Sequence, residues 1–334
     1  MLLTSTLEKL REGPNLLAFS GGVDSSALFF LLLEEKIDFD IVIVNYQTRQ
    51  QSDQEVAYAH ILAKQYHKQC HLLTTSLSDN NFEATARTIR YDFFEQLIKE
   101  YDYNNLITAH QLDDRVEWLL MQLSKGAGLY ELLGSQSIEE KDNYSLVRPL
   151  LETTKSELRE YLAMNDIQFF EDESNKDEKY KRNFFRHNLA APLLKKYSSG
   201  IKKSFTYLDE DLSALHQDNS TVNNVDELYY INDAGSRRST IIAVDKLLKK
   251  LGFLMRQGDK ERLKECDEHV VGRKYVVSFQ GNLCFISPYR NNEMSKEFKE
   301  QCRVLNVPIK LRPYLFDNSD AFEVVHGLLT LEDL

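Results

Sequence analysis

The chain has 334 residues, which is enough for two domains with well-packed cores. Hydrophobic residues make up 42% and charged residues 28%, as in a soluble globular protein. A net charge of −11 disfavours a protein whose whole surface binds nucleic acid. No apolar run is long enough for a membrane span, and the N-terminus lacks the features of a signal peptide, so we expect a cytoplasmic protein without a membrane partner.

Strand and helix patterns alternate through the first half of the chain. The predicted strands are 14–20, 39–46, 71–75, 106–109 and 145–150, and the predicted helices are 24–36, 51–68, 82–101, 113–125 and 154–165. This alternation predicts an α/β fold, a doubly wound parallel sheet with right-handed crossovers.

The rhythm changes after about residue 200. A helix over 237–251, a second over 262–270 and two strands over 275–279 and 283–286 predict a smaller C-terminal α+β domain. We therefore expect a catalytic domain over 1–195, a helical and polar linker over 196–225 and a C-terminal domain over 226–334.

A glycine-rich loop joins the first predicted strand to the first helix. It reads Ser20-Gly21-Gly22-Val23-Asp24-Ser25-Ser26. The glycines let the backbone turn sharply and approach a ligand closely, and the helix N-terminus that follows favours a phosphate. The loop is not a Walker A motif, because the motif's lysine is missing. It resembles the pyrophosphate loop (PP-loop) of the N-type ATP pyrophosphatases, which implies that ATP is cleaved between its α- and β-phosphates.

Asp24 lies where those phosphates would bind. A carboxylate beside phosphates needs an intervening cation, and Mg²⁺ held by one carboxylate and phosphate oxygens is the usual arrangement. A helix N-cap is the alternative role, and the two roles are compatible.

A second polar cluster follows the fourth predicted strand. It contains His110, Asp113, Asp114 and Glu117 at the start of a helix. The carboxyl ends of parallel strands share one edge of a sheet, so we expect this cluster to lie near the glycine loop. Asp114 and Glu117 are three residues apart and face the same side of the helix. Their mutual repulsion would be relieved by a metal ion or by an amine substrate.

The spacing His110-x-x-Asp113-Asp114-x-x-Glu117 is similar to that of the bacterial tRNA(Ile)-lysidine synthase family. The resemblance covers about residues 14–190 and includes two pairs of arginines, Arg87 with Arg90 and Arg182 with Arg186. The chain departs from the family pattern at 45–49, which reads Asn-Tyr-Gln-Thr-Arg instead of Asp-His-Gly-Leu-Arg, and at Trp118, where threonine is usual.

The resemblance implies a two-step ligation. ATP would adenylate the wobble cytidine of an isoleucine tRNA with a CAU anticodon, and the ε-amine of free L-lysine would then replace AMP, giving lysidine, AMP and pyrophosphate. The roles it implies are Mg²⁺ binding by Asp24, ATP binding by residues 20–26 with Arg87 and His110, charge stabilisation by Arg90 and Arg182, and lysine binding and activation by Asp114 and Glu117.

A basic stretch follows the predicted catalytic motifs. Residues 176–203 contain nine basic and two acidic side chains. Arg186, Lys195, Lys196, Lys202 and Lys203 are predicted to contact tRNA, and the family resemblance implies that the C-terminal domain also binds it. A solvated helix face is the alternative explanation of the charge. The sequence leaves open whether the chain forms a homodimer and how it separates this tRNA from the methionine tRNA with the same anticodon.

Other functions share the same loop. A tRNA thiolation enzyme needs a reactive cysteine or a cysteine-bound cluster, but the four cysteines are widely spaced, with no C-x-x-C pair. This spacing also indicates a reducing compartment. An amidating enzyme for a small metabolite would not explain the basic stretch. A non-catalytic ATP-binding sensor would bind ATP without releasing pyrophosphate.

Overall fold

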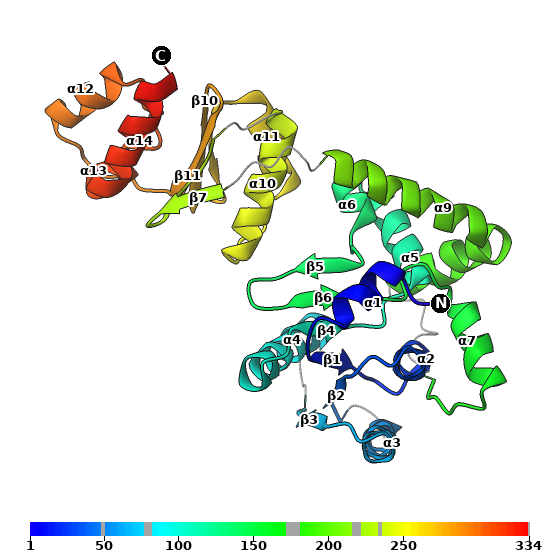
Figure 1. Cartoon of the computed structure of the whole chain (residues 1–334). Coiled ribbons are helices and arrows are strands. Elements are labelled where there is room, and N and C mark those ends of the chain that lie inside the picture. Colours follow the sequence, from blue (N-terminus) through cyan, green and yellow to red (C-terminus); the bar gives the residue numbers. More distant parts are fainter. Residues whose placement is uncertain (48–50, 77–81, 172–180, 216–221, 233–235, 333–334) are drawn as a thin grey trace. The chain divides into compact units, whose positions relative to one another are not determined.

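The computed structural model divides the chain into two compact units, Met1–Ala214 and Leu215–Leu334. The division falls inside the predicted linker 196–225, whose first part belongs to a long helix. The structure describes residues 1–47, 51–76, 82–171, 181–215, 222–232 and 236–332 (Figure 1). Within these residues every helix is too short or too polar to cross a lipid bilayer.

The first unit is built on a six-stranded sheet with the strand order β3-β2-β1-β4-β6-β5. The strands are β1 (Asn15–Ala18), β2 (Asp40–Asn45), β3 (Cys70–Thr74), β4 (Asn105–Ile107), β5 (Ile138–Glu140) and β6 (Ser145–Val147). All neighbours pair in parallel except β5, which pairs antiparallel with β6. The predicted doubly wound sheet is thus confirmed, with one antiparallel edge strand that the sequence pattern did not indicate.

Helices flank both faces of this sheet (Figure 1). They are α1 (Thr4–Leu10), α2 (Val23–Glu34), α3 (Gln51–Gln65), α4 (Phe82–Tyr101) and α7 (Lys155–Met164). Neighbouring residues of one strand serve opposite cores: Leu17 packs in the core with α1, α2, α3 and α7, and Leu16 packs in the core with α4. This two-sided burial explains the continuous apolar strands of the sequence.

The central strands β1 and β4 form the edge of the sheet at which a ligand can bind. The chain runs outward from β1 to β2 and β3 and then returns to β4 on the other side of β1. The connections that leave β1 and β4 therefore diverge at the carboxyl edge of the sheet. In open α/β sheets such a switch point is where ligands bind.

A helical layer follows the sheet. It consists of α5 (Leu112–Leu123), α6 (Leu129–Leu133), α8 (Lys181–Phe185), the π-helix η2 (Arg186–Ala190) and α9 (Ala191–Leu215). Leu112 and Val116 of α5 share a core with Leu194 and Phe205 of α9. The backbone of α9 is kinked at Tyr197, where φ is −132°.

The second unit contains an antiparallel sheet of order β7-β8-β11-β10-β9. Its strands are β7 (Val222–Val225), β8 (Leu228–Ile231), β9 (Glu268–Val271), β10 (Tyr275–Gln280) and β11 (Leu283–Pro288), and its helices are α10 (Arg237–Lys250), α11 (Gln257–Glu265), α12 (Lys296–Val304), α13 (Arg312–Asp317) and α14 (Ser319–Glu332). One core joins the sheet to α10 and α11, and another joins it to α12, α13 and α14. The predicted helix over 262–270 is wrong in its second half, because Val270 and Val271 pair with β10.

Candidate active site

The glycine loop after β1 has a defined shape. Gly21 has a φ of +72°, and a Cβ atom at this position would lie 3.2 Å from Cδ2 of Phe170. The amide of Phe170 donates to the carbonyl oxygen of Gly21 at 2.9 Å. Ser25 Oγ lies 3.0 Å from Ser20 Oγ and accepts from the amide of Ser20 at 3.2 Å. Gly22 is the N-cap of α2. The loop is therefore braced from both sides, and glycine is required at position 21.

Asp24 lies in the first turn of α2, directly after this loop. Burial raises its pKa to about 6; the charge of Lys155 opposes this rise, and those of Asp114 and Asp113 add to it. Its Oδ1 atom is buried without a hydrogen-bond partner among the described residues. A buried carboxylate oxygen without a donor is costly unless a cation approaches it.

The residues around Asp24 fit an Mg²⁺ ion that is held by one protein carboxylate and by phosphate oxygens. Among the described residues no group of three or more His, Cys, Asp or Glu side chains could hold a metal ion. A cation at Asp24 would therefore need oxygen ligands from a phosphate, and this is how Mg²⁺ commonly binds in nucleotide sites.

The start of α5 brings the second polar cluster to the same edge. Gln111 caps the helix, and Asp114 Oδ2 accepts from the amide of Gln111 at 3.2 Å, which completes a capping box. Asp113 Oδ2 accepts from the amide of Lys155 at 3.0 Å, so α5 and α7 are joined at their N-termini. Since Asp113 and Asp114 both act on the pKa of Asp24, the structure brings the two predicted clusters together.

Two arginines hold the carboxylate of Glu117. Arg186 Nε donates to Glu117 Oε2 at 2.8 Å, and Arg182 Nε donates to Glu117 Oε1. The same guanidinium groups lie 3.5 and 3.4 Å from Asp114 Oδ1. The side chain of Glu117 is 2% exposed and that of Asp114 is 20% exposed. Of the two carboxylates predicted to bind lysine, Asp114 is thus the more accessible. Arg186, predicted to contact tRNA, lies with them.

His110 is neutral near pH 7. Burial lowers its pKa to about 4, and the nearby Arg148, Arg87 and Arg182 also lower it, whereas Asp114 raises it. Its Nδ1 atom lies 2.9 Å from Thr108 Oγ1. The imidazole is therefore a fixed polar group at the end of β4, and it is a weak base.

The two arginines of α4 have aromatic partners. Arg87 lies over the ring of Tyr91, with 4.7 Å between its Cζ and the ring centroid. Arg90 Nε donates to Tyr46 Oη at 3.1 Å, and Tyr46 Oη donates to the carbonyl oxygen of Ala86 at 2.8 Å. Tyr46 belongs to the segment 45–49 that departs from the family pattern. It holds Arg90, a contact that the sequence did not predict; residues 48–50 lie outside the described part.

The basic stretch separates into two groups. Lys202 Nζ donates to both carboxylate oxygens of Glu157, at 2.8 and 2.9 Å, and so supports the start of α7. Lys195, Lys196 and Lys203 are exposed on α9. The tRNA contact of these four lysines stays a prediction, and residues 172–180 of the stretch lie outside the described part.

Lys155 belongs to a sequence segment, Lys155-x-Glu157-Leu158, that resembles the family pattern, but the sequence indicated no role for this residue. Its Nζ lies 3.9 Å from Asp24 Oδ2, at the N-terminus of α7. The Thr154–Glu157 capping box was visible in the sequence and correctly located this helix start. Together with the predicted sheet edge it could have indicated that Lys155 lies beside Asp24.

Trp118, which follows Glu117 in the sequence, contacts the end of α6. Its Nε1 donates to the carbonyl oxygen of Glu131 at 2.8 Å. A Cβ atom on Gly134 would lie 2.5 Å from the same Nε1. Trp118 therefore packs against the end of α6.

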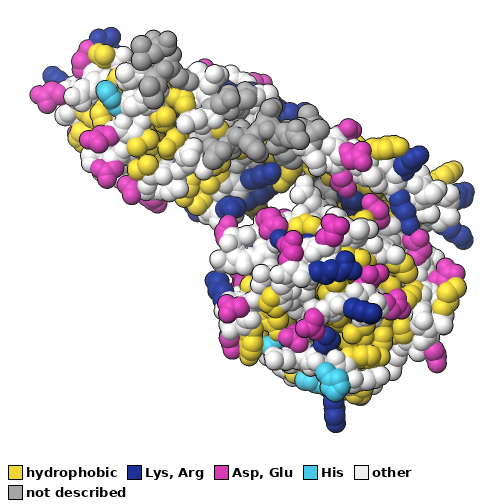
Figure 2. All heavy atoms as spheres, viewed as in Figure 1, with side chains coloured by type: hydrophobic (Ala, Val, Ile, Leu, Met, Phe, Trp, Pro, Cys, Tyr) yellow, Lys and Arg dark blue, Asp and Glu magenta, His cyan; other side chains and the backbone are white. Residues whose placement is uncertain are grey.

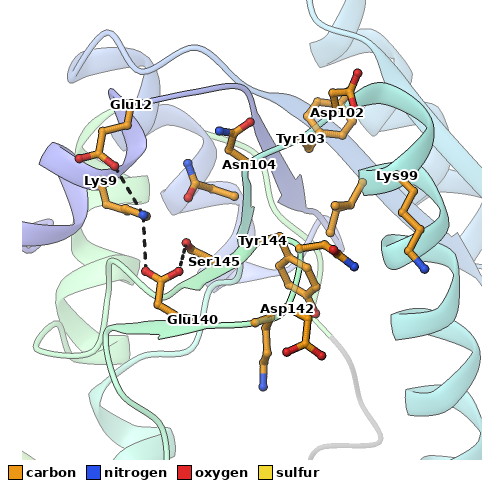
Figure 3. Close-up of a pocket in the computed structure, with 14 residues that line it drawn as sticks. Lys9, Glu12, Lys99, Asp102, Tyr103, Asn104, Glu140, Asp142, Tyr144 and Ser145 are labelled. Carbon is orange, nitrogen blue, oxygen red and sulfur yellow. Dashed lines mark hydrogen bonds and ion pairs between the residues drawn. The ribbon is translucent and has the colours of Figure 1, made fainter. Parts of the chain in front are cut away.

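A cavity of about 760 Å³ lies at the opposite edge of the sheet, where β1, β4 and β6 begin (Figure 3). Lys9 projects into it between two acidic side chains, 3.5 Å from Glu12 Oε2 and 3.4 Å from Glu140 Oε1. None of the predicted site residues lines this cavity. Its side chains are suitable sites for control substitutions.

Comparison with known proteins gives a consistent result. Residues 3–193 match the family model described as a PP-loop domain. The tRNA(Ile)-lysidine synthase of Helicobacter pylori is 43% identical over 313 residues, which cover 93% of this chain and 91% of that protein. The enzymes of the same name from Campylobacter jejuni and Wolinella succinogenes are 42% and 43% identical and cover 93% and 92% of this chain, with 95% and 94% of their own lengths matched. The chain belongs to the tRNA(Ile)-lysidine synthase family.

Proposed function

We propose that the protein is a ligase that joins free L-lysine to C2 of the wobble cytidine of an isoleucine tRNA with a CAU anticodon. ATP is consumed, and lysidine, AMP and pyrophosphate are the products. The observation that supports this proposal is the meeting of the PP-loop and Asp24 with the Asp113–Asp114 pair at one edge of the sheet. One pocket can then serve both a triphosphate and an amine.

In the first step the cytidine O2 attacks the α-phosphorus of ATP, and the bond to pyrophosphate breaks. The glycine loop and the start of α2 offer backbone N–H groups to the phosphates. Asp24 would hold Mg²⁺, which neutralises charge that develops during phosphoryl transfer. Arg90, held by Tyr46, and Arg87 present guanidinium groups that suit the negative charge on the α-phosphate.

In the second step the lysine ε-amine attacks C2, the C2–O bond breaks and AMP leaves. The ammonium of free lysine has a pKa near 10.4, so it must lose a proton to react. Asp114 is the more exposed carboxylate, and its contacts with Arg182 and Arg186 are longer than those of Glu117. We therefore assign lysine binding and acceptance of its proton chiefly to Asp114, and the positioning of the arginines to Glu117.

Two of the four cysteines, Cys70 and Cys284, weigh against the sulfur-transfer alternative. Cys70 begins β3 and so lies away from the carboxyl edge, and burial raises its pKa to about 11. Cys284 is fully buried in the second unit, where burial likewise raises its pKa. These thiols are poor nucleophiles, since the thiolate is the reactive form.

The direct test is incubation of the protein with an isoleucine tRNA transcript, ATP, Mg²⁺ and radiolabelled lysine. We expect label on the RNA that depends on the anticodon cytidine, with release of AMP and pyrophosphate. Release of ADP, or the absence of labelled RNA, would overturn the proposal. ATP binding without release of pyrophosphate would instead favour the sensor alternative.

Two substitutions test the division of roles. Asp24→Asn should lower pyrophosphate release by about 100-fold or more, the usual cost of losing one electrostatic group at a reacting phosphate or carbonyl. Asp114→Asn should leave pyrophosphate release within a few-fold of wild type and raise the KM for lysine. Equal losses of adenylation in both variants would contradict the assignment of Asp114 to lysine.

A further inference from the structure

The glycine loop lacks the lysine that a Walker A motif supplies, but the structure brings one to it from another element. We infer that Lys155 binds the pyrophosphate half of ATP and stays with the pyrophosphate as it leaves, an inference that rests on the proposed function. Its Nζ lies 3.9 Å from Asp24 Oδ2, and its side chain is 32% exposed. Lys155 and Asp24 are 131 residues apart in sequence and adjacent in the fold.

Three contacts fix the backbone of Lys155 next to the loop. Its amide donates to Asp113 Oδ2 at 3.0 Å. The preceding residue, Thr154, caps α7 by accepting from the amide of Glu157 at 3.2 Å. Further along α7, Tyr161 Oη donates to Glu34 Oε1 at 2.6 Å and joins this helix to α2. The lysine is thus placed on a helix start that is anchored to both α5 and α2, the helices that carry the acidic site residues.

The contact between Lys155 and Asp24 is an ion pair that exceeds hydrogen-bond length. The ammonium therefore keeps donors for another acceptor within reach of the same carboxylate. Phosphate oxygens bound at the loop would be such acceptors, and lysine binds phosphate as a compact, mobile point charge. The charge is needed because Asp24 and Asp113 both oppose the approach of an anion, and pyrophosphate leaves with added negative charge.

A purely structural role, in which Lys155 only offsets the charge of Asp24, is the competing explanation. The two roles differ in which ligands they affect. A contact to the pyrophosphate half strengthens binding of ATP and of pyrophosphate but not of AMP. A structural role affects all three ligands alike, because it acts through the shape of the loop.

The experiment measures the affinities of the full-length protein for ATP, inorganic pyrophosphate and AMP by calorimetry, at fixed Mg²⁺ and salt. The variants are Lys155→Met, Lys155→Gln and Lys155→Arg. Lys9→Met is the matched control, since Lys9 is also paired with carboxylates but lines the cavity at the opposite edge. Melting temperatures of the ligand-free proteins establish that each variant folds.

We expect Lys155→Met and Lys155→Gln to weaken ATP and pyrophosphate binding about tenfold or more, the loss of one charge-assisted contact. AMP binding should stay within twofold of wild type, Lys155→Arg should recover most of the affinity, and Lys9→Met should match wild type. Unchanged pyrophosphate affinity, or an equal loss for AMP, would overturn the inference. Release of ADP by the wild-type protein would instead overturn the proposed function, and it is read in a separate assay.

Discussion

Burial favours the neutral forms of two ionisable side chains of the site. It raises the pKa of Asp24 to about 6 and lowers that of His110 to about 4. Near pH 7 Asp24 is still largely ionised, so the site holds a buried negative charge that the cations Lys155 and Arg186 offset. This negative charge favours the binding of a cation such as the Mg²⁺ that accompanies a nucleotide.

The lowered pKa of His110 leads us to predict how the free energy of unfolding depends on pH. Between pH 6.5 and about 4 the unfolded chain binds a proton at this residue that the folded protein does not bind. The free energy of unfolding should therefore fall as the pH drops through this window, by up to roughly 1.4 kcal/mol per pH unit from this group. In His110→Gln the slope should be smaller, as measured by urea unfolding between pH 7.5 and 4.5.

His60→Gln is the control for that measurement, since His60 is exposed on α3. Its removal should leave the pH slope unchanged. An identical slope in wild type and His110→Gln would show that His110 titrates at the same pH in both the folded and the unfolded states, and the argument from burial would be wrong.

The hydrogen bond between Arg90 and the hydroxyl of Tyr46 leads to a second prediction, about the rate of AMP formation. Tyr46→Phe keeps the ring but removes the acceptor of Arg90 Nε. We expect the rate of AMP formation to fall about three- to tenfold, the cost of one hydrogen bond, with an unchanged melting temperature. In an Arg90→Gln background the same substitution should have no further effect.

Tyr101→Phe, at the far end of α4, is the control for Tyr46→Phe and should behave as wild type. If Tyr46→Phe slows the reaction equally with and without Arg90, the hydroxyl acts by another route than Arg90.

The sequence motifs correctly indicated which side chains lie close together at the site. They were less informative about the contacts that each side chain makes. Asp24, Asp114 and Glu117 follow from short spacings beside strand ends. The contacts of Lys155 with Asp24 and of Tyr46 with Arg90 do not, because they arise from strand order, which places the connections after β6 and β2 beside those after β4 and β1. Strand order is a tertiary property that a single sequence does not display.

At the scale of elements, an ion-pair network joins α5 to α8 and η2. Glu117 contributes the buried carboxylate, and Arg182 and Arg186 approach it from the two following helices. Removing one partner of a buried pair costs several kcal/mol, but these arginines are 46% and 23% exposed and can regain water. We therefore expect Glu117→Gln to lower the free energy of unfolding by about 2 kcal/mol.

The matched variant for Glu117→Gln is Asp114→Asn, which alters the more exposed carboxylate of the same network and should cost less than about 1 kcal/mol. Urea unfolding of both variants, with unchanged m-values, makes the comparison. A larger loss for Asp114→Asn would mean that the capping box, rather than the Glu117 network, holds α5 in place.

The elements that the sequence predicted well are those with strong periodicity. The buried strands β1 and β2 and the amphipathic helix α4 lie within a few residues of their predicted ranges. The edge strand β5 was missed, because its Ile-Glu-Glu sequence has the charged character of an edge strand and no apolar run. The π-helix η2 and the kink at Tyr197 depend on packing that the sequence pattern does not encode.

At the scale of the whole molecule, the net charge of −11 hides an uneven distribution. Residues 237–265, which form α10 and α11, contain nine basic and four acidic side chains. Figure 2 shows Lys and Arg side chains over the part of the second unit that carries α10. A basic helical surface on an acidic chain suits the phosphate backbone of a nucleic acid, and this supports the proposal that the second unit binds tRNA.

Reversing charge on this surface tests that proposal. Arg238 and Arg256 are exposed on α10 and at the start of α11. In the variant with both Arg238→Glu and Arg256→Glu, tRNA affinity should fall about tenfold or more, and the slope of log Kd against log salt should decrease by about one per lost phosphate contact. Lys299→Glu on α12 is the control, and pyrophosphate binding by the first unit should be unchanged. An equal loss of affinity in Lys299→Glu would mean that net charge alone attracts the tRNA, whereas a loss confined to α10 and α11 would locate the binding surface.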